Sequence, residues 1–201
     1  MNFQSLYLVV VVLFVTSMLH SPFSSNSTNT IALLPISDTA KLSATIDGNS
    51  INLVNDIEGI KMGSNSIKNI KKLPDSSKVV FQSYLYKTSG GEVIFELNIG
   101  TLKYSGMKPA LPEFINFFKT GKLNYSLLAM DGVEIKYRDS LGILWSTSNG
   151  SQSESNFEFI EISNTSESIR FKAQFSCKLY NLNRESKTMG NGIFTGSFQN
   201  Y

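Results

Sequence analysis

Apolar and polar residues alternate along most of the chain, and this period of two restricts the fold more than any other feature of the sequence. In 171–179, every odd position is apolar and every even position is polar. Successive side chains of a β-strand point to opposite faces, so this segment predicts a strand with one buried face. The same alternation recurs in 93–99 and 133–138. The chain is therefore predicted to be an all-β protein.

Turn sequences separate the alternating segments. Asp47-Gly48 lies between 42–46 and 51–53, and Asn191-Gly192 leads into a last strand at 193–198. Such dipeptides supply the positive φ angles of two-residue hairpin turns, so neighbouring strands are expected to be antiparallel. The remaining predicted strands are 79–86, 92–99, 133–138, 143–147, 157–162 and 171–179.

One segment departs from the alternation. Pro112 can start a helix and Gly121 can cap its end, while three phenylalanines in 114–118 share one helical face. We therefore predict a short helix near 112–120, covering an open end of the sheets. The stretch 55–72 fits a loop, a weak strand or a helical turn.

About nine or ten strands and one short helix favour an antiparallel two-sheet β-sandwich, and a β-barrel is the alternative. No internal repeat and no linker divides the chain after its first forty residues. Residues 42–201 are therefore predicted to form a single β-sandwich domain. A chain of this length buries enough surface to fold without a disulfide or a metal.

The N-terminal segment predicts export. The apolar run 6–19 spans ~21 Å as a helix, less than the ~30 Å hydrocarbon core of a bilayer, which is typical of a signal peptide. Ser25 and Ser27 offer small residues for cleavage, so 1–27 is predicted to be a signal peptide and 28–41 a flexible segment. A retained N-terminal anchor is the alternative. We expect an extracytoplasmic location (periplasmic, secreted or cell-surface), with no stable membrane span after signal removal.

Composition and missing motifs exclude several classes of function. Eighteen Lys and Arg face sixteen Asp and Glu, so the chain lacks the basic surface that a nucleic-acid partner requires. No Gly-rich phosphate loop or dinucleotide motif is present, and no cofactor is expected. His20 is the only histidine and lies in the predicted signal, which removes histidine-based catalysis and zinc sites from the mature chain. Cys177, the only cysteine, is expected to be buried as a small hydrophobe.

A glycosidase needs two carboxylates at a defined separation. Glu92 and Glu96 share one strand face at ~13 Å, beyond the ~6.5–9.5 Å of inverting glycosidases. Asp56 and Glu58 are interpreted as residues of a solvated loop, and Asp139 is expected to cap its turn. No catalytic and no metal-ligating residue is therefore predicted. Carboxylates that converge from separate strands would escape this reasoning, because sequence spacing cannot show them.

Trp145 is the one candidate ligand contact. Its ring could join nearby tyrosines in a stacking platform for a sugar. It shares strand parity with Ile143, however, and large aromatic residues mostly fill the core of a sandwich. Core packing is the preferred interpretation, with the indole N–H bonded to a backbone carbonyl; ligand contact is the alternative.

The second half of the chain also carries a set of motifs: GVEIKYRDSLGILWS in 132–146, FSCKLY in 175–180 and NGIFTGSF in 191–198. Together with SATIDGNSINL in 43–53, this set resembles small exported proteins of Bacteroidota. The resemblance implies a β-sandwich of the cell envelope with no assigned activity. Many of these proteins carry a lipoprotein cysteine after the apolar run, and this chain lacks it.

These observations predict an exported cell-envelope protein that is not an enzyme. Its domain is expected to bind another envelope protein or to take part in assembly. A carbohydrate-binding module with a glycan partner is the alternative, and a glycoside hydrolase is less favoured.

Overall fold

The computed structural model describes residues 39–71, 77–126, 131–165 and 167–200, all within one compact unit that spans residues 35–201. The predicted signal peptide 1–27 lies outside the described residues, as does most of the segment 28–41. At the end of that segment Ala40 is buried, and the first strand begins at Lys41.

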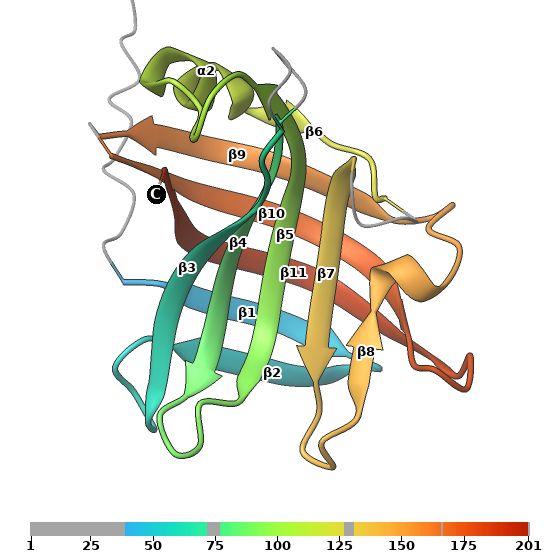
Figure 1. Cartoon of the computed structure of the whole chain (residues 1–201). Helices are drawn as coiled ribbons and strands as arrows, with labels where there is room; N and C mark the ends of the chain where they lie inside the picture. Colours follow the sequence, from blue (N-terminus) through green and yellow to red (C-terminus); the bar gives the residue numbers. More distant parts are fainter. Residues whose placement is uncertain (1–38, 72–76, 127–130, 166, 201) are drawn as a thin grey trace, which may run out of the picture. The chain divides into compact units, whose positions relative to one another are not determined.

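The described residues form eleven strands, one short α-helix and one 3-10 turn (Figure 1). Their bounds are β1 (Lys41–Ile46), β2 (Asn49–Val54), β3 (Ile60–Asn69), β4 (Ser77–Lys87), β5 (Val93–Tyr104), α2 (Leu111–Phe117), β6 (Gly121–Lys122), β7 (Gly132–Arg138), β8 (Leu144–Ser146), η1 (Thr147–Asn149), β9 (Asn156–Asn164), β10 (Ser168–Tyr180) and β11 (Ser186–Gln199). The prediction of an all-β chain with one short helix is confirmed.

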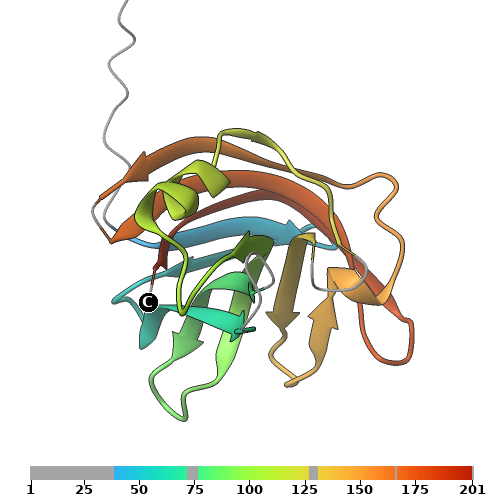
Figure 2. The same ribbon diagram turned by 45° about the horizontal axis from the view of Figure 1, so that its top comes forward.

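The strands form a curled antiparallel sheet, a half-barrel (Figures 1 and 2). Hydrogen-bonded neighbours follow the order β2-β1-β11-β10-β8-β7-β5-β4-β3, and β9 pairs with β10 and β6. Strands β3, β4, β5 and β7 pass in front of β1, β11, β10 and β9 (Figure 1). Between these two halves the order runs through β8, which meets β10 in one residue pair, Tyr180 with Ser146.

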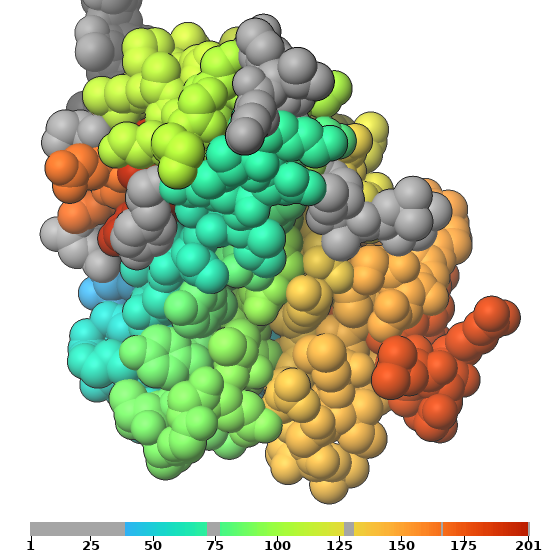
Figure 3. Space-filling model, viewed as in Figure 1, coloured from blue at the N-terminus to red at the C-terminus, as the bar shows by residue number. Residues whose placement is uncertain are grey.

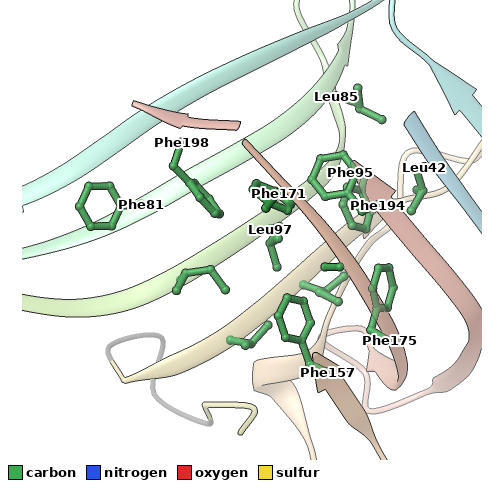
Figure 4. Packing of buried hydrophobic residues seen from close by; sticks show 14 of the residues in the cluster. Leu42, Phe81, Leu85, Phe95, Leu97, Phe157, Phe171, Phe175, Phe194 and Phe198 are labelled. Atoms are coloured by element: carbon green, nitrogen blue, oxygen red, sulfur yellow. The ribbon is translucent and has the colours of Figure 1, made fainter. Parts of the chain in front are cut away.

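The space between the two halves is filled by aromatic side chains (Figure 4). Phe171 and Phe198 stack with their ring centroids 4.6 Å apart, and Phe95 meets Phe194 edge-on at 4.8 Å. These residues occupy the buried face of their alternating strands, as the period of two predicts. The core therefore lies inside the curl, and polar side chains of the same strands point outward.

Helix α2 covers one end of this core. Glu113 accepts a hydrogen bond from the Ala110 backbone N–H at 2.9 Å, which caps the first turn. Phe114 is fully buried, and Phe118 stacks on Phe198 at 4.9 Å. The helix ends at Phe117 because Phe118 adopts an extended backbone to reach the core. The predicted range 112–120 thus has the right position but extends too far, and Gly121 begins β6 instead of capping the helix.

The structure decides the conformation of two further segments, 55–72 and Asn191-Gly192. The stretch 55–72 contains strand β3, the second of the three alternatives, after a tight turn in which Asp56 and Glu58 have positive φ. Asn191-Gly192 does not precede the last strand but lies inside β11, where the register with β10 shifts. The positive φ of Asn191 serves a bulge there instead of a hairpin turn.

Candidate functional site

Trp145 lies on β8 with only 4% of its surface exposed. Its Nε1 donates to Asp139 Oδ2 at 2.9 Å, and Lys187 Nζ lies 4.2 Å from the ring centroid. The predicted backbone-carbonyl partner is therefore wrong, because the β7–β8 register brings the indole beside the turn carboxylate. Ile143, the expected companion, precedes β8 and is 38% exposed.

Asp139 joins three parts of the domain. Its Oδ1 accepts the backbone N–H groups of Leu141 and Ile143, each at 3.0 Å, so the carboxylate caps its turn as predicted. Its Oδ2 accepts from Trp145 and from Lys187 Nζ at 2.9 Å. Burial favours a higher pKa for Asp139, but the hydrogen bonds from Lys187, Trp145 and the two backbone groups outweigh it and lower the pKa to about 2. The carboxylate is ionised at neutral pH and ties the β7–β8 hairpin to β11.

Two carboxylates converge on the outward face of β5 and β7. Asn98 Nδ2 donates to Glu96 Oε1 at 2.6 Å and to Glu134 Oε2 at 3.0 Å. Lys136 Nζ lies 3.0 Å from the same Glu96 oxygen and 3.5 Å from the same Glu134 oxygen. The two acids therefore share one amide and one ammonium, and we call these four residues the carboxylate cluster.

The other carboxylate oxygen of Glu134 is also occupied. Ser146 and Ser148 donate hydroxyl hydrogen bonds to Oε1 at 3.0 and 2.8 Å. Burial raises the pKa of Glu134, while Ser148, Lys136, Asn98 and Ser146 together lower it below its ordinary value. Burial lowers the pKa of Lys136, but the nearby carboxylates raise it overall. Glu134 is therefore ionised and Lys136 protonated at neutral pH, and the four residues of the cluster pair with one another.

The sequence does not predict the carboxylate cluster. It places Glu96 on one strand face with Glu92, but Glu92 faces Arg138 Nε at 3.4 Å. The convergence depends on the β5–β7 register, in which Glu96 pairs with Lys136 and Asn98 with Glu134. The alternation in the sequence predicts that these polar side chains point outward. It does not predict that β5 pairs with β7, because a helix separates the two strands in the chain.

A hollow of about 450 Å³ lies against β3, β4 and β5, and its walls include Tyr84, Tyr86 and Val93. Figure 3 views the molecule from the side on which these strands lie. The Tyr84 ring covers Gly63 on the neighbouring strand, where a Cβ atom would lie 2.4 Å from the ring. Tyr84 and Tyr86 are partly exposed, with ring centroids 5.9 Å apart and planes inclined at 51°. This is an aromatic surface open to solvent, although not a flat one.

Cys177 and Asp56, the remaining candidates from the sequence, have roles in packing and in a surface ion pair. Cys177 is buried as predicted, and burial raises the pKa of its thiol to about 12, so it is protonated at neutral pH. Asp56 is exposed and forms an ion pair with Lys61. Within the described ranges, no group of three or more His, Cys, Asp or Glu residues could hold a metal ion. No helix in these ranges is long and apolar enough to cross a membrane.

Comparisons of the chain with protein-family models, with curated proteins and with solved structures found no match.

We expect Asp139→Asn to lower the free energy of unfolding by about 1–3 kcal/mol at neutral pH, because an amide cannot accept all four hydrogen bonds. The pKa of Asp139 is lowered from 3.8 to about 2 in the folded state. Its contribution is therefore complete above pH 3.8 and is lost as the pH falls through 2. Denaturant titrations of both proteins should show the difference shrinking over that interval.

Ser140→Ala is the matched control, because Ser140 is exposed in the same turn. It should change stability by less than about 0.5 kcal/mol. Equal effects of the two substitutions would contradict the role assigned to the Asp139 carboxylate.

Proposed function

We propose that the chain is an exported, non-catalytic binding or assembly domain of a cell envelope. The internal pairing of the carboxylate cluster is the observation that carries the non-catalytic part. A glycoside hydrolase needs a carboxylic acid with a raised pKa as proton donor. Glu134 has a lowered pKa, and both of its oxygens accept hydrogen bonds from protein groups. Support for export comes from the apolar run 6–19 and from the resemblance to exported proteins of Bacteroidota.

We include in the proposal a two-sheet arrangement for the half-barrel, in preference to a closed barrel. One sheet would contain β3, β4, β5, β7 and β8, and the other β1, β2, β6, β9, β10 and β11. The narrow join supports this division, since β8 and β10 share one residue pair whereas β10 and β11 pair along most of their lengths.

The Tyr84–Tyr86 hollow is the proposed binding surface. It lies beside β3, which ends the order of hydrogen-bonded strands and has one strand neighbour among the described residues. A partner protein could place side chains in the hollow, against the rings of the two tyrosines. Partly exposed tyrosines favour such contacts, since they offer a large apolar area and a polar tip.

A carbohydrate partner is the second candidate, favoured by the same two tyrosines. Sugar rings stack on aromatic faces, and the polar side chains of Asn65 and Gln82 follow on the same outward face. The 51° inclination between the rings leaves no flat platform, which places a protein partner first.

The non-catalytic assignment predicts that Glu134→Gln acts on stability. We expect a loss of about 1–3 kcal/mol in the free energy of unfolding near neutral pH, because the substitution removes the charge that compensates Lys136. The folded pKa of Glu134 is lowered, so its contribution is present above the ordinary value of 4.5 and disappears as the pH falls below it. Glu154→Gln, at a side chain 78% exposed, is the control and should have little effect. Hydrolysis of aryl glycosides by the native protein, lost in Glu134→Gln at unchanged stability, would overturn the assignment.

The binding surface is tested by a photo-crosslinking amino acid at position 86, incorporated in the native envelope. Position 174, an exposed residue of β10 in the other half of the sheet, is the control. We expect a discrete adduct at position 86 alone. A protein partner adds peptides of a second sequence to a tryptic digest of the adduct, whereas a glycan partner adds mass that glycosidases remove. Equal adducts at both positions would refute the hollow as the binding surface.

Export predicts that the protein isolated from its native envelope lacks 1–27 and begins near Thr28. Intact-mass measurement distinguishes this form from the complete chain. Recovery of the complete chain from the envelope would favour the retained anchor.

A further inference from the structure

Two lysines face each other where β4 begins and β5 ends, at the end of the domain that carries α2 (Figure 1). Lys78 is the direct cross-strand partner of Lys103 in the β4–β5 register. Like charges directly opposite each other destabilise a sheet. Within the described residues, neither lysine forms a salt bridge with a carboxylate. This pair therefore keeps two unneutralised positive charges side by side.

Further lysines gather at the same place. Ser77 Oγ accepts from the Lys71 backbone N–H at 3.0 Å and lies 3.5 Å from the Gly106 carbonyl oxygen. These two contacts bring the end of β3 and the loop after β5 to the start of β4. The exposed Lys71 and Lys108 belong to the two segments that meet there. We call these four residues the lysine corner.

Among the described residues, no carboxylate forms an ion pair with a lysine of the corner. Glu113 is engaged in capping α2, and Glu167 lines a groove together with Lys108. The segment 72–76 contains one lysine and one aspartate, and so adds no net charge. The corner thus has a positive excess in a chain whose overall charge is only +2.

Exposed apolar side chains flank these lysines. Met107 is 73% exposed and lies between Gly106 and Lys108, while Ile70 is 46% exposed beside Lys71. An exposed apolar side chain gains free energy only by leaving water. Lysines interspersed with exposed apolar residues are typical of surfaces that bind the interface of an anionic bilayer, where each component has a partner.

We propose that the lysine corner binds the surface of a membrane containing anionic phospholipids. The ammonium groups of Lys71, Lys78, Lys103 and Lys108 contact lipid phosphates, and Met107 enters the interfacial layer. The lipid charge also relieves the repulsion between Lys78 and Lys103. A soluble polyanion would satisfy the lysines but would give Met107 no apolar surroundings. This inference goes beyond the proposed function, because it concerns a different surface from the Tyr84–Tyr86 hollow.

The test is co-sedimentation with vesicles of phosphatidylcholine alone or with about one-third phosphatidylglycerol. The complete chain is used, and its N-terminal segment is identical in all variants and cancels in their ratios. We expect Lys78→Gln with Lys103→Gln to weaken partitioning onto the anionic vesicles roughly thirtyfold, because each lysine near such a surface contributes about 1 kcal/mol. Met107→Ser should weaken it several-fold as well.

The control is Lys172→Gln with Lys178→Gln, which removes the same charge from β10. Each of these lysines forms an ion pair, with Glu161 and Glu154 respectively, at 3.0 Å. We expect this control to bind anionic vesicles within about threefold of the native protein. Misfolding is excluded by thermal denaturation, since removing Lys78 and Lys103 should leave the melting temperature equal or higher.

Equal loss of vesicle binding in the Lys78/Lys103 variant and the control would overturn the proposal. So would lysine-dependent binding to soluble polyphosphate, with no binding to vesicles and no effect of Met107→Ser. Those results would assign the lysine corner to a soluble polyanion or to net charge alone.

Discussion

Packing of phenylalanine rings between the two halves of the curled sheet holds the domain together, and the other features follow from it. Backbone pairing joins the halves at two narrow places: one residue pair between β8 and β10, and the segment 121–126, which pairs with β9 and bonds to Val133 of β7. Between these places, rings such as Phe81, Phe118 and Phe198 contact one another across the interior. Truncation of one such buried ring to alanine costs about 3–5 kcal/mol, a large part of the stability of a domain. Helix α2 completes this core by supplying Phe114 and Phe118 at its end.

A core of this kind leaves most charged and amide side chains of the strands on the outward face, and near the middle of the sheet some of them are still buried, such as Asn98 and Glu134. The chain stabilises them by pairing. Glu134 is surrounded by Asn98, Lys136 and two serines, and Asp139 accepts from Trp145, Lys187 and its own turn. Both carboxylates have lowered pKa values for the same reason. Hydrogen-bond donors and a nearby lysine stabilise the ionised form by more than burial destabilises it. Groups held in this way are suited to fixing strand register and poorly suited to proton transfer.

Binding capacity is expected where this internal pairing stops. The Tyr84–Tyr86 hollow lies beside a strand edge, and the lysine corner lies where β3, β4 and β5 end. The hollow offers partly exposed tyrosine rings, and the corner offers lysines that form no ion pair among the described residues, together with exposed apolar side chains. A domain with one surface for a partner and another for an anionic bilayer would act as an adaptor at the envelope.

The sequence by itself determined the β-class, most strands, the helix position, the burial of Cys177 and the turn cap at Asp139, because all of these depend on local periodicity and turn chemistry. Tertiary structure decided which strands pair. The register of β5 with β7 created the carboxylate cluster, and that of β7 with β8 gave Trp145 a carboxylate partner where a carbonyl was expected. The β10–β11 register places Asn191-Gly192 at a bulge inside β11, where the sequence predicted a turn. Residues distant in the sequence meet only when the sheet curls, and alternation within one strand carries no information on its neighbour.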